Sequence, residues 1–586
     1  MAEHQSRRAF LKHAAAAGGT VALSSVFAAT ALANESPAGE GGPQDEGGPG
    51  GGGMPMMGGG TVSGEWRTAP DPIADDQIAA EKTADFIVVG AGHAGTNCAR
   101  VLAERGRSVI LIEKQPEDTM SMLGNDIGHI NSNMNRSFGV PDADPIEFYN
   151  NWMMVSGNQA QPTLVMQFAQ RGGEAIDAFC DVYDDEQKKN FSIYFWDNGE
   201  GFPNMPEKIG NQQFWYGCLN LRGKNCNMNM TEAYAIQRQA IVDNGGQIDY
   251  ATDAEQLVQD ADGKVVAVIA TNADGDYIKY NATCAVALCA GDFSGHETMR
   301  DELLPALKGV CIESNGEGLG GMGGRTGRGL QLGYWAGGRL EAGPIATLGG
   351  DYVNPSGICA NDGIPIWLDS NGERFCNEFF GGPEIAGRPG ARDAHTTKYC
   401  VYDGNVLEQL TYGLPCHTSF DYSDEDSRNS VTEKLAAARE AGAEGANGIY
   451  CADDLETLAS YLGLEGAVAE NFVASVERYN QMCEQGRDDD FGRDPRVLWK
   501  LEAPYYAQAT QRFMIGMMMV SLGGLCTDGH SNVLAEDYTP IPGLYAAGNN
   551  CGRRFGPAYF TPIAGVSIGF AVTQGYVLGD YLAQNL

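Results

Sequence analysis

The chain has 586 residues, with 39 Lys and Arg against 76 Asp and Glu, which gives a formal net charge of −37 at pH 7. So acidic a chain repels nucleic acid and anionic membrane surfaces, and neither is expected as a partner. A chain of this length has room for roughly two to four domains with large apolar cores.

The N-terminus has the pattern of an export signal. Residues 6–12 read SRRAFLK, an Ala-rich and moderately apolar run follows, and residues 31–33 read Ala-Leu-Ala. This order resembles a twin-arginine signal with an A-x-A cleavage site. We expect residues 1–33 to be removed after export by the twin-arginine translocase. The mature protein is then expected in the periplasm or on the extracytoplasmic face of the membrane.

A polar segment separates this signal from the rest of the chain. Residues 34–80 are rich in Gly, Pro and acidic side chains and begin without a periodic apolar pattern. Such a segment buries too little surface to offset the entropy lost on ordering. We therefore expect a disordered linker here. No later run of about twenty apolar residues occurs, so no membrane span is expected after cleavage.

A nucleotide-binding pattern follows the linker. An apolar run at residues 86–89 leads into the sequence GAGHAG at residues 90–95. A helical pattern comes next, and then a second apolar run at residues 109–112 that ends on Glu113. A G-x-G-x-x-G turn between a strand and a helix, with an acid after the second strand, is typical of dinucleotide binding. A plain βαβ turn is the alternative.

The three glycines of this turn have separate expected roles. Gly90 makes the tight turn, Gly92 lets the backbone approach a pyrophosphate, and Gly95 lets the helix pack closely on its strand. The phosphates are expected over the helix N-terminus, where free N–H groups and the helix dipole favour anions. Glu113 is expected to accept hydrogen bonds from a ribose.

The next segments alternate between helical and strand patterns. Residues 141–184 have apolar side chains at helical spacing and predict covering helices. Short strands with Asp-Gly turns are predicted at residues 247–250, 255–259 and 265–271, as a small antiparallel sheet. They lead to a buried parallel strand at residues 285–289, whose end is expected to face the cofactor.

A second G-x-G-x-x-G pattern occurs at residues 316–321. It is either a nicotinamide-nucleotide turn or a Gly-rich loop. The residues that follow are too rich in Gly to open a helix, and no strand ending on an acid comes about twenty residues later. The loop is therefore favoured.

The remaining pattern predicts a mixed region and a return to the first domain. A buried helix starts at 330–335, a hairpin covers 364–375, and residues 431–485 are mainly helical. A buried strand at 544–548 and a long helix at 567–582 close the chain.

Fifteen cysteines occur at irregular spacings, without C-x-x-C. Because export in a folded state implies folding among reduced thiols, we expect mostly free, buried cysteines. The eight histidines show no metal-ligand spacing either, so no protein-bound metal is expected.

Four further motifs follow the nucleotide fingerprint in a fixed order: CAGDF at 289–293, NGERFCNE at 371–378, IPGLYAAGN at 541–549 and GVSIG at 565–569. Together they resemble the fumarate reductase/succinate dehydrogenase-type flavoproteins, which are related to the 3-ketosteroid dehydrogenases. The resemblance spans about residue 83 to the C-terminus.

The resemblance implies an α/β (α+β overall) fold. A Rossmann-like FAD-binding domain, discontinuous in sequence, covers residues 81–311 and 519–586, and an inserted α+β capping domain covers 312–518. Non-covalent FAD is expected, because no His lies near Met122, where some relatives attach flavin covalently. The expected cofactor contacts are Gly90, Gly92, Ala94, Gly95, Glu113, Lys114, Gly124, Asn125, Asp126, Gly291, Asp292, Gly548, Asn549, Ser567 and Ile568.

The resemblance also implies hydride transfer from flavin to a polarised C=C bond. Its cap proton donor, an Arg followed by Asp, corresponds best to Arg392, with Arg388 as the second choice and a solvent-exposed loop Arg as the alternative. Tyr559 matches the Tyr of the ketosteroid dehydrogenase loop. Its hydroxyl and the N–H of Gly565 are expected to donate to a substrate carbonyl, unless Tyr559 is a packed aromatic.

The departures from the family pattern concern the substrate. No His precedes Gly523 and Gly524, Tyr559 stands where dicarboxylate enzymes have a substrate-binding Arg, and residues 358–361 lack a Glu-x-x-Arg relay. A small dianion such as fumarate would be poorly paired. The Met-rich residues 514–519 suit an apolar pocket or a core strand.

These features predict an exported FAD-dependent reductase of an activated C=C bond, in an enone or a bulky or aromatic enoate. Its electron donor is expected to be external, a membrane-anchored multihaem c-type cytochrome. The alternatives are a dehydrogenase of the ketosteroid Δ1-dehydrogenase type, which runs in the reverse direction, and a non-catalytic flavin carrier.

Overall fold

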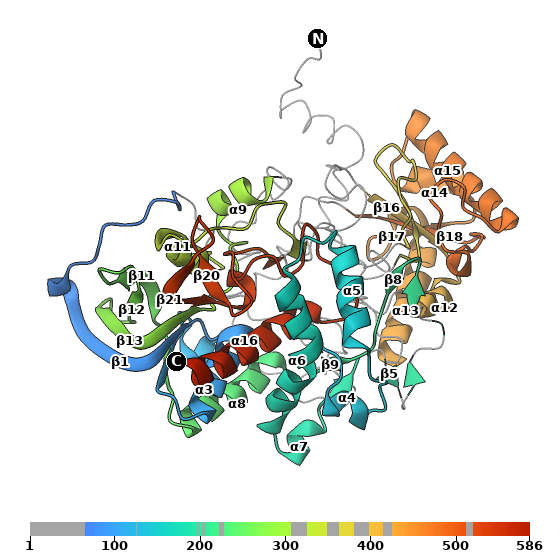
Figure 1. The fold of residues 1–586 in the computed structure, drawn as a ribbon. Helices are drawn as coiled ribbons and strands as arrows, with labels where there is room; N and C mark the ends of the chain where they lie inside the picture. Colours follow the sequence, from blue (N-terminus) through green and yellow to red (C-terminus); the bar gives the residue numbers. More distant parts are fainter. Residues whose placement is uncertain are drawn as a thin grey trace, which may run out of the picture.

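A computed structural model describes most of the chain after residue 64 (Figure 1). The described residues are 65–122, 124, 126–194, 196–197, 200–201, 204, 207–221, 228–305, 325–348, 363–379, 398–413, 425–510 and 520–586.

A mostly parallel sheet forms the centre of the larger part of the molecule. Its strands run in the order β10 (Gln247–Asp249), β2 (Val109–Ile112), β1 (Ile78–Val89) and β13 (Tyr277–Leu288), and β21 (Pro540–Ala546) pairs in parallel with the end of β13. The inner strands are continuous apolar runs because helices and loops cover both faces. The strands predicted at 86–89, 109–112 and 544–548 are thus confirmed in one sheet.

An antiparallel extension continues the same sheet beyond β13. β12 (Val265–Thr271) pairs with β13, and β11 (Asp253–Gln259) pairs with β12. The antiparallel pairing predicted for 255–259 and 265–271 is confirmed, but these strands extend the main sheet, and the first predicted strand, β10, is not part of the antiparallel pairing. β13 is long enough to pair with β12 near its start and with β21 near its end. β10 lies parallel to β2 because the helix before it, α8 (Met230–Asp243), crosses over the sheet.

Helices cover the sheet. α3 (His93–Glu104) packs against α8 (Met230–Asp243) and α16 (Val566–Asn585). α16 also packs on α6 (Pro162–Asp181), and α6 packs on α5 (Pro145–Val155) (Figure 1). The helices predicted over 141–184 and 567–582 are confirmed. Within the described ranges, no helix has the length and apolarity that a bilayer crossing needs.

A second, smaller α+β part lies to one side, coloured orange in Figure 1. Its antiparallel sheet has the order β15 (Ile366–Leu368), β16 (Lys398–Asp403), β18 (Tyr505–Thr510) and β17 (Ile449–Ala452). We call this part the cap. The predicted hairpin is present, since a turn after β15 brings Arg374 into a bridge with Leu368. The cap helices are α12 (Val406–Gln409), α13 (Glu425–Ala441), α14 (Leu455–Tyr461) and α15 (Gly466–Gln485).

Residues 325–348, which the sequence analysis assigns to the cap, lie instead on the main sheet. α11 (Arg328–Trp335) contributes Leu332 to the core of that sheet. Thr347 of β14 (Thr347–Leu348) then pairs with Ser521 of β19 (Val520–Ser521). These residues belong with the main sheet because the apolar side of α11 is buried against β11 rather than against a cap element.

The end of the expected linker also packs on the folded body. Trp66 is 2% exposed, and its indole N–H donates to Glu302 at 2.8 Å. Its ring shares a core with Phe293 and Leu330. Since β1 already begins at Ile78, residues 66–80 are not part of a disordered linker. The earlier linker residues lie outside the described residues.

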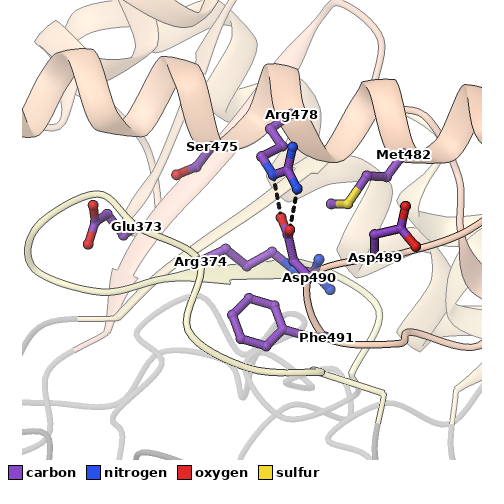
Figure 2. Close-up of a pocket in the computed structure, with 8 residues that line it drawn as sticks. All are labelled: Glu373, Arg374, Ser475, Arg478, Met482, Asp489, Asp490 and Phe491. Atoms are coloured by element: carbon purple, nitrogen blue, oxygen red, sulfur yellow. Dashed lines mark hydrogen bonds and ion pairs between the residues drawn. The ribbon is translucent and has the colours of Figure 1, made fainter.

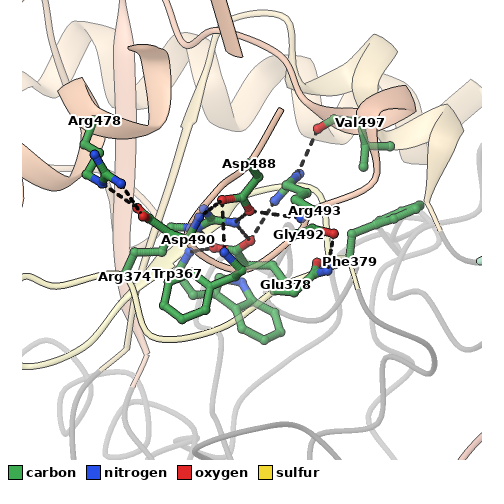
Figure 3. A network of polar contacts seen from close by, with 12 residues as sticks. Trp367, Arg374, Glu378, Phe379, Arg478, Asp488, Asp490, Gly492, Arg493 and Val497 are labelled. Carbon is green, nitrogen blue, oxygen red and sulfur yellow. Dashed lines mark hydrogen bonds and ion pairs between the residues drawn. The ribbon is translucent and has the colours of Figure 1, made fainter. Parts of the chain in front are cut away.

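A buried network of four charged side chains holds the cap together (Figure 3). Arg374 donates to both carboxylate oxygens of Glu378 at 2.8 Å and to Asp488 at 2.8 Å, and Arg493 donates to Glu378 at 3.1 Å. Burial raises the pKa of Glu378, but the arginines outweigh burial and hold that pKa below its ordinary value. The network ties the β15 hairpin to the segment after α15.

The described cysteines are free, and all but Cys284 and Cys483 are buried. Burial raises the pKa of Cys289 to about 12, so its thiol stays protonated and inert. The prediction of free, buried cysteines is confirmed for the described residues.

Candidate active site

The G-x-G-x-x-G turn has the predicted strand–turn–helix geometry. Gly90 follows β1 with φ +97°, and its N–H donates to the carbonyl of Ile112 at 2.8 Å, which ties the turn to β2. A Cβ on Gly95 would lie 1.9 Å from the carbonyl oxygen of Gly90. Only a glycine therefore lets α3 approach the turn this closely.

Gly92 caps α3 and borders open space. A Cβ built on Gly92 has no atom within 4 Å, and the residue is extended, with φ −74° and ψ −166°. No side chain caps the helix there. The first N–H groups of α3 thus face an uncapped space, which suits an anionic phosphate group.

The Glu113 carboxylate stands at the end of β2 beside this turn. One oxygen accepts from the N–H of Ala91 at 2.7 Å and the other from the N–H of Gln115 at 2.8 Å. Burial raises the pKa of Glu113, and these two hydrogen bonds oppose that rise. A buried carboxylate so oriented can still accept from ribose hydroxyls. Lys114 is turned outward, 3.7 Å from Asp253.

Residues from the end of the chain complete the same site. Gly565 caps α16 with φ +69°, and a Cβ there would lie 2.7 Å from the Asp126 carbonyl oxygen. Gly124 lies against Ile568 in the first turn of α16, next to Ser567. These predicted contact residues come from distant parts of the sequence and meet at one helix N-terminus.

Gly548, from the same C-terminal portion, lies beside α3. A Cβ on Gly548 would come 2.9 Å from the Cβ of Ala94. Asn550 joins this segment to the end of β13, because its amide donates to the Gly291 carbonyl at 2.7 Å and accepts from the Ala290 N–H at 2.6 Å. The carboxyl ends of β13 and β21 are thereby held together.

Asp292 is buried in a polar cluster at this edge. Its carboxylate accepts from the Ser294 N–H at 2.7 Å and from the Ser521 hydroxyl at 3.1 Å, and it lies 3.6 Å from Arg325. These contacts link β13, β19 and the start of α11. A contact between Asp292 and the cofactor stays a prediction.

The residues present fit FAD. An uncapped helix N-terminus borders open space at Gly92, and a buried carboxylate stands at the expected ribose position. A second helix N-terminus, that of α16, lies across the site with Gly565 at its cap. Two helix N-termini suit a cofactor with a pyrophosphate and an electron-accepting ring.

The loop between Gly548 and α16 carries Tyr559. The Tyr559 side chain is 2% exposed, and its ring meets Phe555 edge-on with centroids 4.9 Å apart. Both interpretations from the sequence, a carbonyl-binding hydroxyl and a packed aromatic, agree with this burial. Tyr559 shares a buried core with six aromatic rings, two of them from the loop itself: Phe148, Trp152, Phe168, Phe555, Phe560 and Phe570.

Two buried polar side chains of this loop were missed by the sequence analysis. Arg554 donates to the side-chain oxygen of Asn549 and to the Cys551 carbonyl, but its Nη1 has no partner among the described residues. Burial lowers its pKa. The Thr561 hydroxyl is likewise buried without a partner in the described part of the chain. The sequence did contain a signal for this site, because Arg554 stands among the aromatic residues of the loop.

Glu341 is a third buried group that the sequence analysis missed. Its carboxylate accepts from the N–H of Gly524 at 2.9 Å and from that of Arg553 at 2.8 Å. Burial raises its pKa to about 7. Glu341 follows α11, and its two hydrogen bonds connect the loop at Gly524 with the loop at Arg553.

His129 lies beneath α16 and is neutral. Its ring nitrogens bond to the Ile127 carbonyl at 2.9 Å and the Ser132 hydroxyl at 2.7 Å. Burial lowers its pKa to about 4. It acts as a packed residue rather than as an acid at neutral pH.

Several predicted residues lie outside the described residues. They are Asn125, the cap arginines Arg388 and Arg392, the second Gly-rich pattern at 316–321, the relay position at 358–361 and the Met-rich segment at 514–519.

A cavity of about 460 Å³ lies in the cap between the β15 hairpin and α15 (Figure 2). Its acidic residues outnumber its arginines, and Arg478 is already paired with Asp490. None of the predicted cofactor residues lines it. This cavity is therefore separate from the FAD site. Its lining residues are Glu373, Arg374, Ser475, Arg478, Met482, Asp489, Asp490 and Phe491.

Comparison with known proteins agrees with this site. Residues 85–567 match the family described as FAD binding domain. Vinyl phenol reductase of Lactiplantibacillus plantarum is 26% identical over 532 residues, which cover 86% of this chain and 98% of that protein. Fumarate reductase (cytochrome) of Shewanella frigidimarina is 25% identical over 515 residues, which cover 86% of this chain and 77% of that protein.

A solved structure supports the fold. The 3-ketosteroid-Δ4-(5α)-dehydrogenase from Rhodococcus jostii RHA1, in complex with 4-androstene-3,17-dione, superimposes with a TM-score of 0.63. The match covers 87% of this chain and 98% of that chain at 20% identity. The predicted fold class, a Rossmann-like domain with an inserted cap, is confirmed. The chain belongs to the FAD binding domain family, among the fumarate reductase/succinate dehydrogenase-type flavoproteins, and is an FAD-dependent oxidoreductase of the kind that acts on CH–CH groups.

Proposed function

We propose that this protein reduces an activated C=C bond in an enone or a bulky or aromatic enoate, with non-covalent FAD and electrons from an external donor. The observation that carries the proposal is the place of Tyr559. It is buried among aromatic rings in the loop that leads directly to the N-terminus of α16. A neutral hydroxyl at this position can donate a hydrogen bond to a carbonyl oxygen, but it does not balance the charge of a dianion.

FAD supplies the hydride when it is bound. The Tyr559 hydroxyl and the N–H of Gly565 donate to the substrate carbonyl and stabilise the negative charge that develops on it. Arg392 gives the proton to the second carbon, and Arg388 is the alternative donor. These two assignments rest on the resemblance of the sequence.

The relatives support a C=C reductase. One is a vinyl phenol reductase and another a fumarate reductase (cytochrome). The second name supports a cytochrome as the electron donor, which we propose to be a membrane-anchored multihaem c-type cytochrome. Export by the twin-arginine pathway to the periplasm is part of the proposal and rests on residues 6–33.

A substrate panel tests the reaction. With reduced methyl viologen as donor, the FAD-loaded protein is expected to reduce 4-hydroxycinnamate or a cyclic enone at least about 10-fold faster than fumarate, since Tyr559 and Gly565 offer donors to one carbonyl oxygen rather than to two carboxylates. Viologen oxidation at 600 nm and product analysis measure the rates. Faster turnover of fumarate contradicts the substrate class, and no turnover of any alkene favours a flavin carrier. Ketosteroid oxidation with an artificial acceptor, without reduction, favours a dehydrogenase.

Tyr559→Phe is expected to lower kcat by about 10²- to 10³-fold, because one donor to the developing oxyanion is lost. FAD content and KM should change little, since the ring and its packing stay. Steady-state kinetics and the flavin absorbance of the purified variant measure these effects. Tyr576→Phe is the control, because that hydroxyl donates to Glu174 of α6 from the middle of α16 rather than from its N-terminus. Equal kcat in the Tyr559 variant would make Tyr559 a packed aromatic.

A further inference from the structure

α8 carries a buried arginine that has no ionic partner among the described residues. Arg238 is 5% exposed, and its Nε and Nη1 are buried without a hydrogen-bond partner in the described part of the chain. Guanidinium N–H groups without acceptors are costly to bury, because they lose their hydration and no hydrogen bond replaces it. An acceptor that the protein itself does not provide is therefore expected at this place.

The face of α8 that carries Arg238 looks toward the nucleotide turn. Tyr234 lies four residues earlier, so both side chains project from one face of the helix. The Tyr234 hydroxyl accepts from Asn97 at 3.2 Å, and its ring meets His93 edge-on with centroids 4.9 Å apart. Asn97 and His93 belong to the first turns of α3. Arg238 is thus directed at the space beside the fingerprint helix.

Two further side chains border the same space. Burial raises the pKa of Glu113, and the positive charge of Arg238 opposes that rise. Tyr250, which follows β10, is within reach of Arg238, whose charge and hydrogen bond likewise oppose the effect of burial on the pKa of Tyr250. The guanidinium therefore faces the end of β2 and the end of β10, where the adenosine half of a dinucleotide lies in this fold.

We propose that Arg238 binds the ribose of the FAD adenosine, donating from Nε and Nη1 to the hydroxyl oxygens whose protons Glu113 accepts. A hydroxyl group has one proton to give and two lone pairs to receive, so a carboxylate and a guanidinium together satisfy it. Arg238 carries no part of the nucleotide fingerprint. The inference rests on FAD binding and is independent of the substrate and direction of the reaction.

The test uses the full-length apoprotein and ADP, which is the nucleotide half of FAD. Calorimetric titration is expected to show about 10- to 100-fold weaker ADP binding to Arg238→Met than to the wild type, since a charge-assisted hydrogen bond is lost. With 2′,3′-dideoxy-ADP, which lacks both hydroxyls, the wild type and the variant are expected to bind equally. Arg238→Lys keeps the positive charge but loses the planar pair of donors, so its ADP affinity is expected to lie between those of the wild type and Arg238→Met. It replaces the Met variant if that variant does not fold.

Arg100→Met is the matched control. Arg100 is 1% exposed, and its Nε and Nη2 also lack partners among the described residues, but its Nη1 donates to Glu104 at 2.6 Å, away from Glu113. Its ADP affinity is expected to equal that of the wild type. Unchanged ADP affinity in both Arg238 variants overturns the proposal. An equal loss for ADP and its dideoxy analogue also overturns it, because the guanidinium would then meet a phosphate or the adenine.

Discussion

Gly92→Ala is expected to abolish FAD binding while leaving the apoprotein folded. The residue has φ −74°, which alanine adopts without strain, and the new Cβ would enter open space. That space borders the N-terminus of α3, where the pyrophosphate is expected. A methyl group there blocks the approach of the phosphates, and FAD affinity is expected to fall by about 100-fold or more.

Flavin fluorescence quenching on titration of the apoprotein measures the affinity, and the melting temperature of the apoprotein is expected to change by no more than about 2 °C. Gly404→Ala in the cap is the control for an added methyl group, because its Cβ would have no neighbour closer than 3.8 Å. Gly95→Ala should instead destabilise the fold itself, since its Cβ meets the Gly90 carbonyl. Normal FAD affinity in Gly92→Ala would show that the cofactor phosphates lie elsewhere.

Glu378→Ala is expected to destabilise the cap by about 3–5 kcal/mol, because it leaves two buried guanidinium groups without their shared acceptor. Arg374 retains Asp488, but Arg493 loses its only carboxylate among the described residues. Urea unfolding followed by tryptophan fluorescence measures the change, since Trp367 lies next to Glu378. FAD affinity is expected to stay unchanged, because the network is confined to the cap.

Glu484→Ala is the control for loss of a carboxylate. Glu484 pairs with Lys500 at the cap surface, and such exposed pairs contribute at most about 1 kcal/mol. A loss of similar size in both variants would mean that the buried network does not hold the cap.

The same network predicts the response of the cap to acid. Burial opposes ionisation of Asp488, but Arg374 outweighs it and lowers the pKa from 3.8 to about 2. A carboxyl group whose pKa is lower in the folded state binds fewer protons there than in the unfolded chain. Its contribution is therefore complete above pH 3.8 and is lost as the pH falls toward 2.

The nucleotide turn could be predicted because its signal is local. Gly90, Gly92, Gly95 and Glu113 lie within one βαβ unit, and the chain geometry of that unit fixes where each residue points. The long helices at 145–181 and 566–585 were likewise predictable, since apolar spacing alone identifies them.

The buried charges could not be predicted in this way. Glu341 acts on the N–H of Gly524, 183 residues away, and Arg374 on Asp488, 114 residues away. The residues near Glu341 and Arg374 in the sequence do not indicate these partners, because each contact depends on how separate elements pack. The parallel pairing of β10 with β2 was missed for the same reason.

The contact between α3 and α16 sets an order of events during synthesis. The ribosome makes α3 early and α16 long afterwards, the two helices pack against each other, and both carry proposed FAD contacts. A nascent chain still attached to the ribosome has only the nucleotide turn and cannot enclose the flavin. We therefore expect FAD to be enclosed only after α16 has been synthesised and has packed on α3.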